Sequence, residues 1–374
     1  MTGDQASEGF IDWTVATTVA AAVSRGESRD AWADDPRPTR AREICDEALA
    51  RALEYTRLDP VAFVPTAELI SRREWIASNV SMMSELSSPL EARAQGELRL
   101  PWPFGGVVRG ALGAAAGAEA GVVVGYAARR VLGQYQVSLS PTASPGDQRP
   151  RMLLISSNLS QVAAEIGADL EGFLRWVAIH EQTHSVQFAA VPWLRDHVAG
   201  LLARLIEAAA AGVDVSALAG AARRLVSSDP RRALGEMMRG ELARAVAGPE
   251  QAETLDRLQA AMAVIEGYAE HVMDAAAADD PSLARMRAAV DQRRARRAGL
   301  ADLIARALGL GMKLRQYELG KRFGDAVVSR GGIDAFNRVW ESPAALPSLA
   351  ELESPELWLT RTEAAEPGFS PAGA

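Results

Sequence analysis

The chain has 374 residues, of which 48% are hydrophobic and 24% charged, a composition typical of a globular protein large enough for two or three domains. Its net charge of -8 argues against a general affinity for nucleic acid, because phosphate binding needs a basic surface. The single cysteine, Cys45, excludes an intramolecular disulfide and suits a reducing compartment. No basic segment precedes the first apolar stretch, so we expect a cytoplasmic protein without a secretory signal.

The N-terminal region, residues 1–140, is predicted to be helical. Apolar residues recur at helical spacing over 13–24, 40–57 and 67–86, and prolines mark the turns between these segments. Pro65-Thr66 supplies the expected start signal of the third helix. We therefore expect a set of helices joined by proline-bearing turns.

A further segment, 105–126, carries a glycine at every fourth position, which would place a glycine stripe on one helix face. A small-residue stripe lets two helix backbones approach closely, either inside a soluble fold or between membrane helices. Glu119 near the middle, and the excess of Ala and Gly over Leu and Ile, make insertion into a bilayer unfavourable. The stripe therefore favours tight helix packing over a membrane span. Its members are Gly113, Gly117, Gly121 and Gly125.

Residues 152–156, Met-Leu-Leu-Ile-Ser, are the clearest strand candidate, because this short apolar run is bounded by Pro150 and Asn158. Two interpretations stay open. The strand could lie at a sheet edge and bind an extended substrate backbone by strand addition, or it could be an ordinary interior strand.

The most informative motif is the HExxH sequence at residues 180–184, which lies in an amphipathic run, 170–188, predicted to be one helix. Residues four apart share a helix face, so His180 and His184 can direct their imidazoles at one zinc ion. Glu181 lies about 100° round the helix and can act as general base on a zinc-bound water. The alternative is a pair of surface histidines, but two of the four histidines in the chain fall in this motif. The pattern therefore predicts one half of a zinc hydrolase site.

A zinc site of this kind needs a third protein ligand. The metzincin pattern would place Gly and His where this chain has Gln187 and Ala190, so that class is excluded. His197 and His271 are the two remaining histidines and are candidate third ligands.

Residues 266–271, Glu-Gly-Tyr-Ala-Glu-His, lie in a second predicted helix, 249–278, and resemble the Glu-Gly-Phe-Ala segment of gluzincin aminopeptidases. In that family the Glu is the third zinc ligand, so the resemblance implies Glu266. Glu270, one turn later, is expected either to accept a hydrogen bond from a ligating histidine or to be a solvated charge. The separation between His184 and Glu266 is much longer than in gluzincins, and the aminopeptidase signature Gly-x-Met-Glu-Asn is absent. The resemblance therefore does not imply exopeptidase activity.

From about residue 100 onward, the chain resembles the zincin-like metallopeptidase type-two family, which is largely actinobacterial. The resemblance implies a zincin-like fold, a zinc cofactor and a peptide or protein substrate. The segments that carry it are 176–184 with Gln187-Phe188, 266–269, 313–318, and 336–340 followed by Ser342-Pro343.

The segment 313–317, Lys-Leu-Arg-Gln-Tyr, concentrates three groups that can stabilise an oxyanion. Zincins commonly place a Tyr, His or Arg opposite the zinc, where negative charge develops. We therefore predict this role for Tyr317, with Arg315 as the second choice. The alternative is structural: an ion pair between Arg315 and Glu318, with Tyr317 packed in the core.

The predicted fold is mainly α with a small β-sheet. A zincin-like catalytic region, 141–360, follows the helical N-terminal region, contains a helical insertion, 193–248, and ends before a disordered tail, 361–374. The predicted function is zinc-dependent hydrolysis of peptide bonds, with Glu181 as general base. A non-peptide amidohydrolase, or a catalytically silent zinc protein that acts through protein partners, remains an alternative.

Overall fold

The structure is a computed structural model that describes residues 11–26, 37–97, 105–138, 149–212, 249–278, 280–293 and 311–364. The chain divides into two compact units, each built from segments that are distant in sequence. Unit 1 comprises residues 1–41, 67–170 and 202–251, and unit 2 comprises residues 42–66, 171–201 and 252–374.

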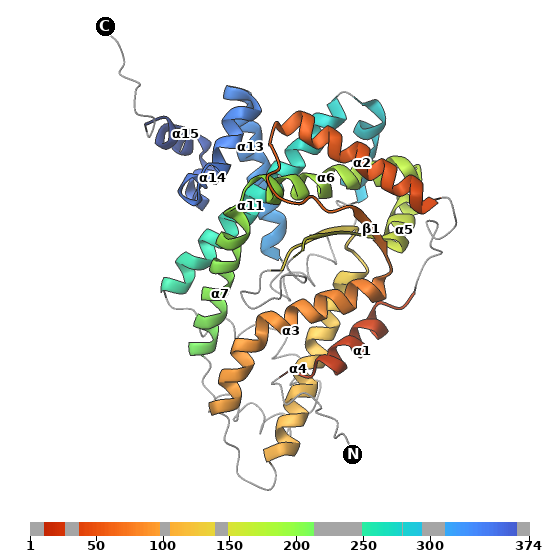
Figure 1. Cartoon of the computed structure of the whole chain (residues 1–374), viewed down its shortest axis with the longest axis vertical. Coiled ribbons are helices and arrows are strands. Elements are labelled where there is room, and N and C mark those ends of the chain that lie inside the picture. Colours follow the sequence, from red (N-terminus) through yellow and green to blue (C-terminus); the bar gives the residue numbers. More distant parts are fainter. Residues whose placement is uncertain are drawn as a thin grey trace. The chain divides into compact units, whose positions relative to one another are not determined.

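The described residues form a mainly helical fold with one small sheet, which confirms the predicted fold class (Figure 1). The two helices expected to carry metal ligands are present: α6 spans Leu170–Ala190 and α11 spans Pro249–Ala278. The other helices are α1 (Trp13–Val23), α2 (Arg37–Thr56), α3 (Arg72–Glu97), α4 (Gly105–Ala128), α5 (Ser156–Ile166), α7 (Leu194–Gly212), a helix over 281–293, α13 (Gly311–Asn337), the 3-10 helices η1 (Arg338–Trp340) and η2 (Pro343–Ala345), α14 (Leu349–Glu353) and α15 (Pro355–Ala364).

Unit 1 contains a three-stranded sheet in the order β1-β3-β2. Strand β3 (Arg151–Ile155) pairs in parallel with β1 (Ala67–Ile70) and antiparallel with β2 (Gly133–Gln136). Residues 152–155 of β3 are fully buried, so the strand expected from the sequence is confirmed. Because β3 is the middle strand, the interpretation of it as a substrate-binding edge is wrong, and it is an interior strand.

The helix predicted over 67–86 is wrong at its start, because residues 67–70 form strand β1 and helix α3 begins at Arg72. Pairing with β3, more than 80 residues away, outweighs the weak local preference of Ala-Glu-Leu-Ile for helix. The start signal of α3 is a reciprocal cap: the backbone N–H of Ser71 donates to Glu74 Oε2 (2.7 Å), and that of Glu74 donates to Ser71 Oγ (3.2 Å).

The glycine stripe of α4 packs against α1, and Figure 1 shows the two helices side by side. A Cβ atom added at Gly117, Gly121 or Gly125 would lie 2.2, 2.5 or 2.6 Å from a backbone oxygen of α1 or of Asp12, which precedes it. Only glycine permits this approach, so the stripe serves helix packing inside unit 1. Among the described residues, no helix is long and apolar enough to cross a membrane.

The core of unit 2 is an aromatic cluster that joins segments from different helices. Tyr268 of α11 is fully buried between the rings of Phe336 and Trp340, at centroid distances of 4.9 and 5.5 Å. Its hydroxyl donates to Asn337 Oδ1 (2.7 Å), and Asn337 Nδ2 donates to the backbone oxygen of Thr56 (2.8 Å). The segment 336–340 is therefore the packing partner of the Glu-Gly-Tyr-Ala segment.

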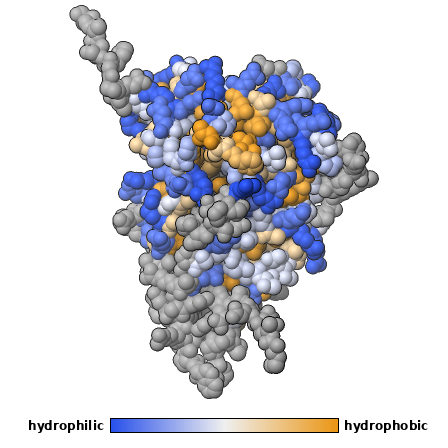
Figure 2. All heavy atoms as spheres, viewed as in Figure 1, coloured by the Kyte–Doolittle hydropathy of each residue, from blue (hydrophilic) through white to orange (hydrophobic). Residues whose placement is uncertain are grey.

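The loop that follows α2 in unit 2 covers the C-terminal end of α6. The backbone N–H groups of Val61 and Ala62 both donate to the oxygen of Ala189 (3.0 Å each), which satisfies a terminal helix carbonyl. Val61 and Phe63 of this loop are 69% and 62% exposed. On the face drawn in Figure 2, apolar side chains gather in the upper part and hydrophilic ones surround them.

Several sequence-based predictions fall outside the described residues. Of the predicted insertion, 193–248, helix α7 is described and residues 213–248 are not. Of the predicted tail, 361–374, the first four residues belong to α15, and residues 365–374 lie outside the described part.

Candidate metal centre

Helix α6 brings the two histidines of the HExxH motif together. Buried Phe173, Val177 and Val186 anchor the helix in the apolar interior. His180 and His184 lie one turn apart, and their Nε2 atoms are 3.2 Å from each other. The two rings meet edge to face, at an interplanar angle of 85°.

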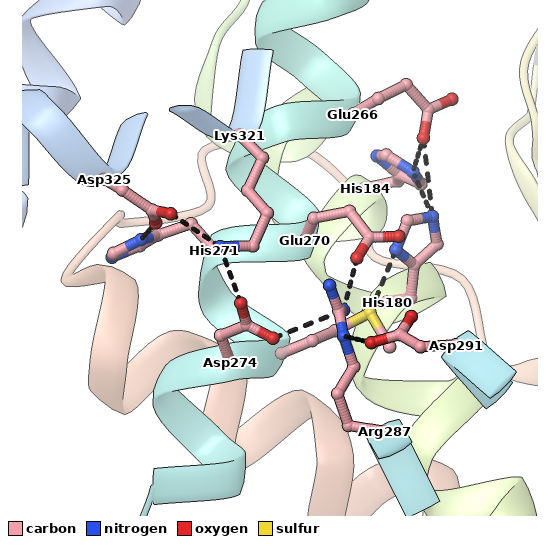
Figure 3. Close-up of polar contacts among 11 residues, drawn as sticks. His180, His184, Glu266, Glu270, His271, Asp274, Arg287, Asp291, Lys321 and Asp325 are labelled. Carbon is pink, nitrogen blue, oxygen red and sulfur yellow. Dashed lines mark hydrogen bonds and ion pairs between the residues drawn. The ribbon is translucent and has the colours of Figure 1, made fainter. Parts of the chain in front are cut away.

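Helix α11 adds a carboxylate to this pair, as Figure 3 shows. Glu266 Oε2 lies 3.4 Å from Nε2 of His180 and 3.4 Å from Nε2 of His184. The side chains of His180 and Glu266 are each 18% exposed, and that of His184 is 9% exposed. The three groups are thus held by the fold but remain partly open to solvent.

The spacing of these three atoms fits a zinc ion. Ligand atoms about 2.0–2.1 Å from a tetrahedral zinc lie roughly 3.3–3.4 Å from one another. The observed separations are 3.2, 3.4 and 3.4 Å. Glu266 Oε2 is also buried without a hydrogen-bond partner, although a buried carboxylate oxygen normally has one. Two imidazoles and an unpartnered carboxylate are a donor set that zinc accepts, with a fourth position free.

The electrostatics of the three groups are strongly coupled. Burial alone would lower the pKa of His184, but Glu266, Glu181 and Gln187 together outweigh burial and raise this pKa to about 9. Burial would raise the pKa of Glu266, but the two histidines outweigh it and lower this pKa well below its usual range. Glu266 is therefore ionised, and without a metal its negative charge stabilises the protonated form of His184. A divalent cation would take the place of that positive charge and release the proton.

The two rival histidines have other partners in the structure. His271 lies between Tyr55 and Asp325: its Nε2 is 2.8 Å from the Tyr55 hydroxyl and its Nδ1 is 2.7 Å from Asp325 Oδ1. His197 packs edge to face on the ring of Trp193. Within the described part of the chain, the grouping of His, Cys, Asp and Glu side chains suited to a metal consists of His180, His184 and Glu266. The geometry thus favours Glu266 over both histidines.

Glu181 lies beside the ligand set without belonging to it. It is 7% exposed on α6, and its carboxylate is close enough to His184 to contribute to the raised pKa of that ring. This position suits a group that acts on water at the metal, as the motif predicts.

The Nδ1 atoms of the two histidines have partners that the sequence reasoning missed. His184 Nδ1 lies 2.8 Å from Oε1 of Gln187, and His180 Nδ1 lies 3.2 Å from Sδ of Met273. Gln187 was within reach of sequence reasoning, because a residue three positions after His184 shares its helix face. Met273 was not, because its approach depends on how α11 packs against α6.

Glu270 belongs to a series of alternating charges contributed by α11, the helix over 281–293 and α13 (Figure 3). It is 4% exposed, so the interpretation as a solvated charge is wrong. Arg287 pairs with Glu270 and with Asp274 (3.2 Å), and Lys321 pairs with Asp274 (2.7 Å) and with Asp325. Arg287 thus neutralises a buried carboxylate one turn from the proposed ligand. A hydrogen bond from a ligating histidine to Glu270 stays a prediction.

Gly267, next to the proposed ligand, marks the crossing of α11 and α13. A Cβ atom there would lie 2.1 Å from the backbone carbon of Gly320, and one at Gly320 would lie 1.8 Å from the backbone oxygen of Ala263. Both contacts are with backbone, which cannot rotate away. The two glycines therefore allow the backbones of α11 and α13 to touch at the residue next to Glu266.

We predict that Gly267→Ala destabilises the protein by about 3 kcal/mol or more, the upper part of the range for overpacking, because the clash is with main chain. Thermal and denaturant unfolding measure the effect. Gly110→Ala on α4 is the matched control, since a Cβ there meets nothing within 4 Å and better helix propensity should stabilise by about 0.5–1 kcal/mol. Equal stability of the two variants would contradict the direct backbone contact between α11 and α13 at Gly267.

Arg315 and Tyr317 lie in the first turns of α13. Their side chains fall outside the described part of the structure, so the predicted oxyanion role stays a prediction.

Comparisons with known proteins bear on the family of the chain. No match was found among curated proteins. A crystal structure from Chloroflexus aurantiacus, described as a "putative hydrolase with a novel fold", is 28% identical, with a TM-score of 0.66, covering 95% of this chain and 100% of that chain.

The zincin-like metallopeptidase family matches residues 11–359, which include α6, α11 and the segments that pack around them. This family, together with the His-His-Glu group, supports a zinc metallohydrolase. The match spans nearly the whole chain, and the chain belongs to the zincin-like metallopeptidase family.

Proposed function

We propose that this protein is a zinc-dependent peptidase in which His180, His184 and Glu266 hold the metal. One observation carries the proposal: three donor atoms from two helices converge at tetrahedral spacing, and one of them is a buried carboxylate oxygen without a hydrogen-bond partner. When bound, zinc would supply Lewis-acid chemistry, polarising a substrate carbonyl and lowering the pKa of water at the site towards about 7.

The chain itself contributes proton transfer. Glu181 takes a proton from the attacking water and returns it to the leaving amine as the peptide bond breaks. Its burial beside His184, outside the ligand set, supports this role. The partial exposure of His180 and Glu266 leaves the site accessible to water and substrate.

Tyr317 completes the proposal as the group that binds the negative charge developing on the substrate oxygen, with Arg315 as the alternative. A comparison of kcat for Tyr317→Phe and wild type decides between them. An unchanged kcat would move the role to Arg315.

A peptide or protein substrate is the class that the family supports. The same groups could attack a non-peptide amide, and a silent zinc protein would keep the ligands without using Glu181. These alternatives differ in what the zinc-loaded protein hydrolyses.

Metal removal tests the proposal directly. We expect the purified protein to hold about one zinc per chain and to cleave members of an internally quenched peptide library. Dialysis against a chelator should abolish cleavage, and stoichiometric zinc should restore it. Equal cleavage by the metal-free protein would contradict a zinc mechanism. A zinc-loaded protein that cleaves other amides but no peptides would be an amidohydrolase, and one inert towards both would be a zinc scaffold.

A further inference from the structure

Gln187 connects the two helices that carry the proposed ligands. Its side chain is fully buried on α6, three residues after His184. Oε1 lies 2.8 Å from His184 Nδ1, and Nε2 donates to the backbone oxygen of Ile265 at 3.0 Å. Ile265 is the residue immediately before Glu266 on α11. One amide thus contacts one ligand directly and the backbone next to another.

These two contacts determine which ring nitrogen of His184 carries hydrogen. A backbone carbonyl only accepts hydrogen bonds, so the group that faces Ile265 must be the amide N–H₂. The oxygen of Gln187 therefore faces His184 and accepts from Nδ1–H. In the neutral ring this leaves Nε2 unprotonated, with its lone pair directed towards His180 Nε2 and Glu266 Oε2.

We propose that Gln187 is a positioning residue that holds His184 in the Nδ1-protonated tautomer and fixes its ring relative to α11. The proposal rests on the zinc site proposed above. Hydrogen bonds to the outer nitrogen of a metal-binding histidine orient the ring and preselect the metal-binding tautomer. Gln187 does so with a neutral amide, and its second hydrogen bond couples that orientation to the position of Glu266.

Gln182 offers a matched comparison on the same helix. It is 1% exposed, and its Nε2 donates to the backbone oxygen of Cys45 at 3.3 Å. It is thus a buried glutamine amide bonded to a backbone carbonyl, like Gln187, but its oxygen makes no hydrogen bond. A purely structural role of a buried amide would give the two residues similar substitution effects.

The test measures zinc affinity by competition with a chromophoric chelator in Gln187→Met and Gln182→Met. Gln187→Met is expected to weaken zinc binding by about 10- to 100-fold, because the tautomer and orientation of His184 are no longer selected. Gln182→Met should leave the zinc affinity close to that of the wild type, because the hydrogen bond of the Gln182 side chain goes to Cys45 and not to a proposed ligand. The absorption spectrum of the cobalt-substituted protein should shift in Gln187→Met alone.

Gln187→Glu separates the effect of Gln187 on zinc affinity from its effect on stability. This variant also replaces Gln187→Met in the test if the methionine variant does not fold. It keeps an acceptor for His184 but places an oxygen against the Ile265 carbonyl, so it should lower the melting temperature while retaining near wild-type zinc affinity. Equal zinc affinity in Gln187→Met and Gln182→Met would overturn the proposal and leave the zinc site intact. A wild-type protein without zinc affinity would overturn both proposals. Because the readouts are metal binding and thermal stability, the result does not depend on peptide cleavage.

Discussion

Glu181→Gln is expected to retain zinc and the fold while losing peptide hydrolysis by about 100- to 10,000-fold, the usual contribution of a general base, or more if both proton transfers depend on Glu181. The amide is nearly the same shape as the carboxylate but cannot take a proton from water. Because Glu181 is not one of the converging ligand groups, metal content should stay the same. Single-turnover cleavage and zinc analysis of one preparation measure the two quantities together.

Glu171→Gln is the control for this substitution. Glu171 lies in the first turn of the same helix, α6, and the change in charge is identical. We expect wild-type activity in this variant. Cleavage by Glu181→Gln at the wild-type rate would remove the general base from the mechanism, whereas loss of zinc in that variant would show that Glu181 supports the metal site.

Local patterns in the sequence were sufficient to predict the helices of the site. Both α6 and α11 have a continuous apolar face, and helical spacing alone places His180 and His184 together. The periodicity on α11 did not choose between Glu266 and His271, because both lie on that helix. The choice of Glu266 stays a proposal, and it is supported because Tyr55 and Asp325, from distant segments, occupy both ring nitrogens of His271.

The sheet shows where such patterns fail. Strand β3 is apolar from Met152 to Ile155 and was predicted, but β1 consists of Ala-Glu-Leu-Ile and has no strand signal of its own. It is a strand because β3 is available to pair with it. The glycine stripe of α4 was similarly predicted to contact a helix, but its partner α1 could be known only from the packing.

Glu266→Ala is expected to lose zinc under conditions in which the wild type holds about one ion per chain. A catalytic zinc site needs three protein ligands, and only the two histidines would remain. The loss of affinity should exceed the roughly 10- to 100-fold expected for a residue that only supports a ligand, such as Gln187. Removal of Glu266 also removes the charge that holds a proton on His184, so the pKa of that ring should fall. Metal analysis and titration of the His184 ring by NMR check these two expectations.

His271→Ala is the decisive partner of that experiment, because His271 was the rival ligand on the same helix. It should retain zinc but lower stability by about 1 kcal/mol or more, since Tyr55 and Asp325 both lose a hydrogen-bond partner. Full zinc retention in Glu266→Ala together with zinc loss in His271→Ala would show that the third ligand is His271. Such a result would require α11 to turn about its axis on metal binding, because in this structure His271 is bound to Asp325 and Tyr55, and Glu266 is the α11 side chain that meets both histidines of α6.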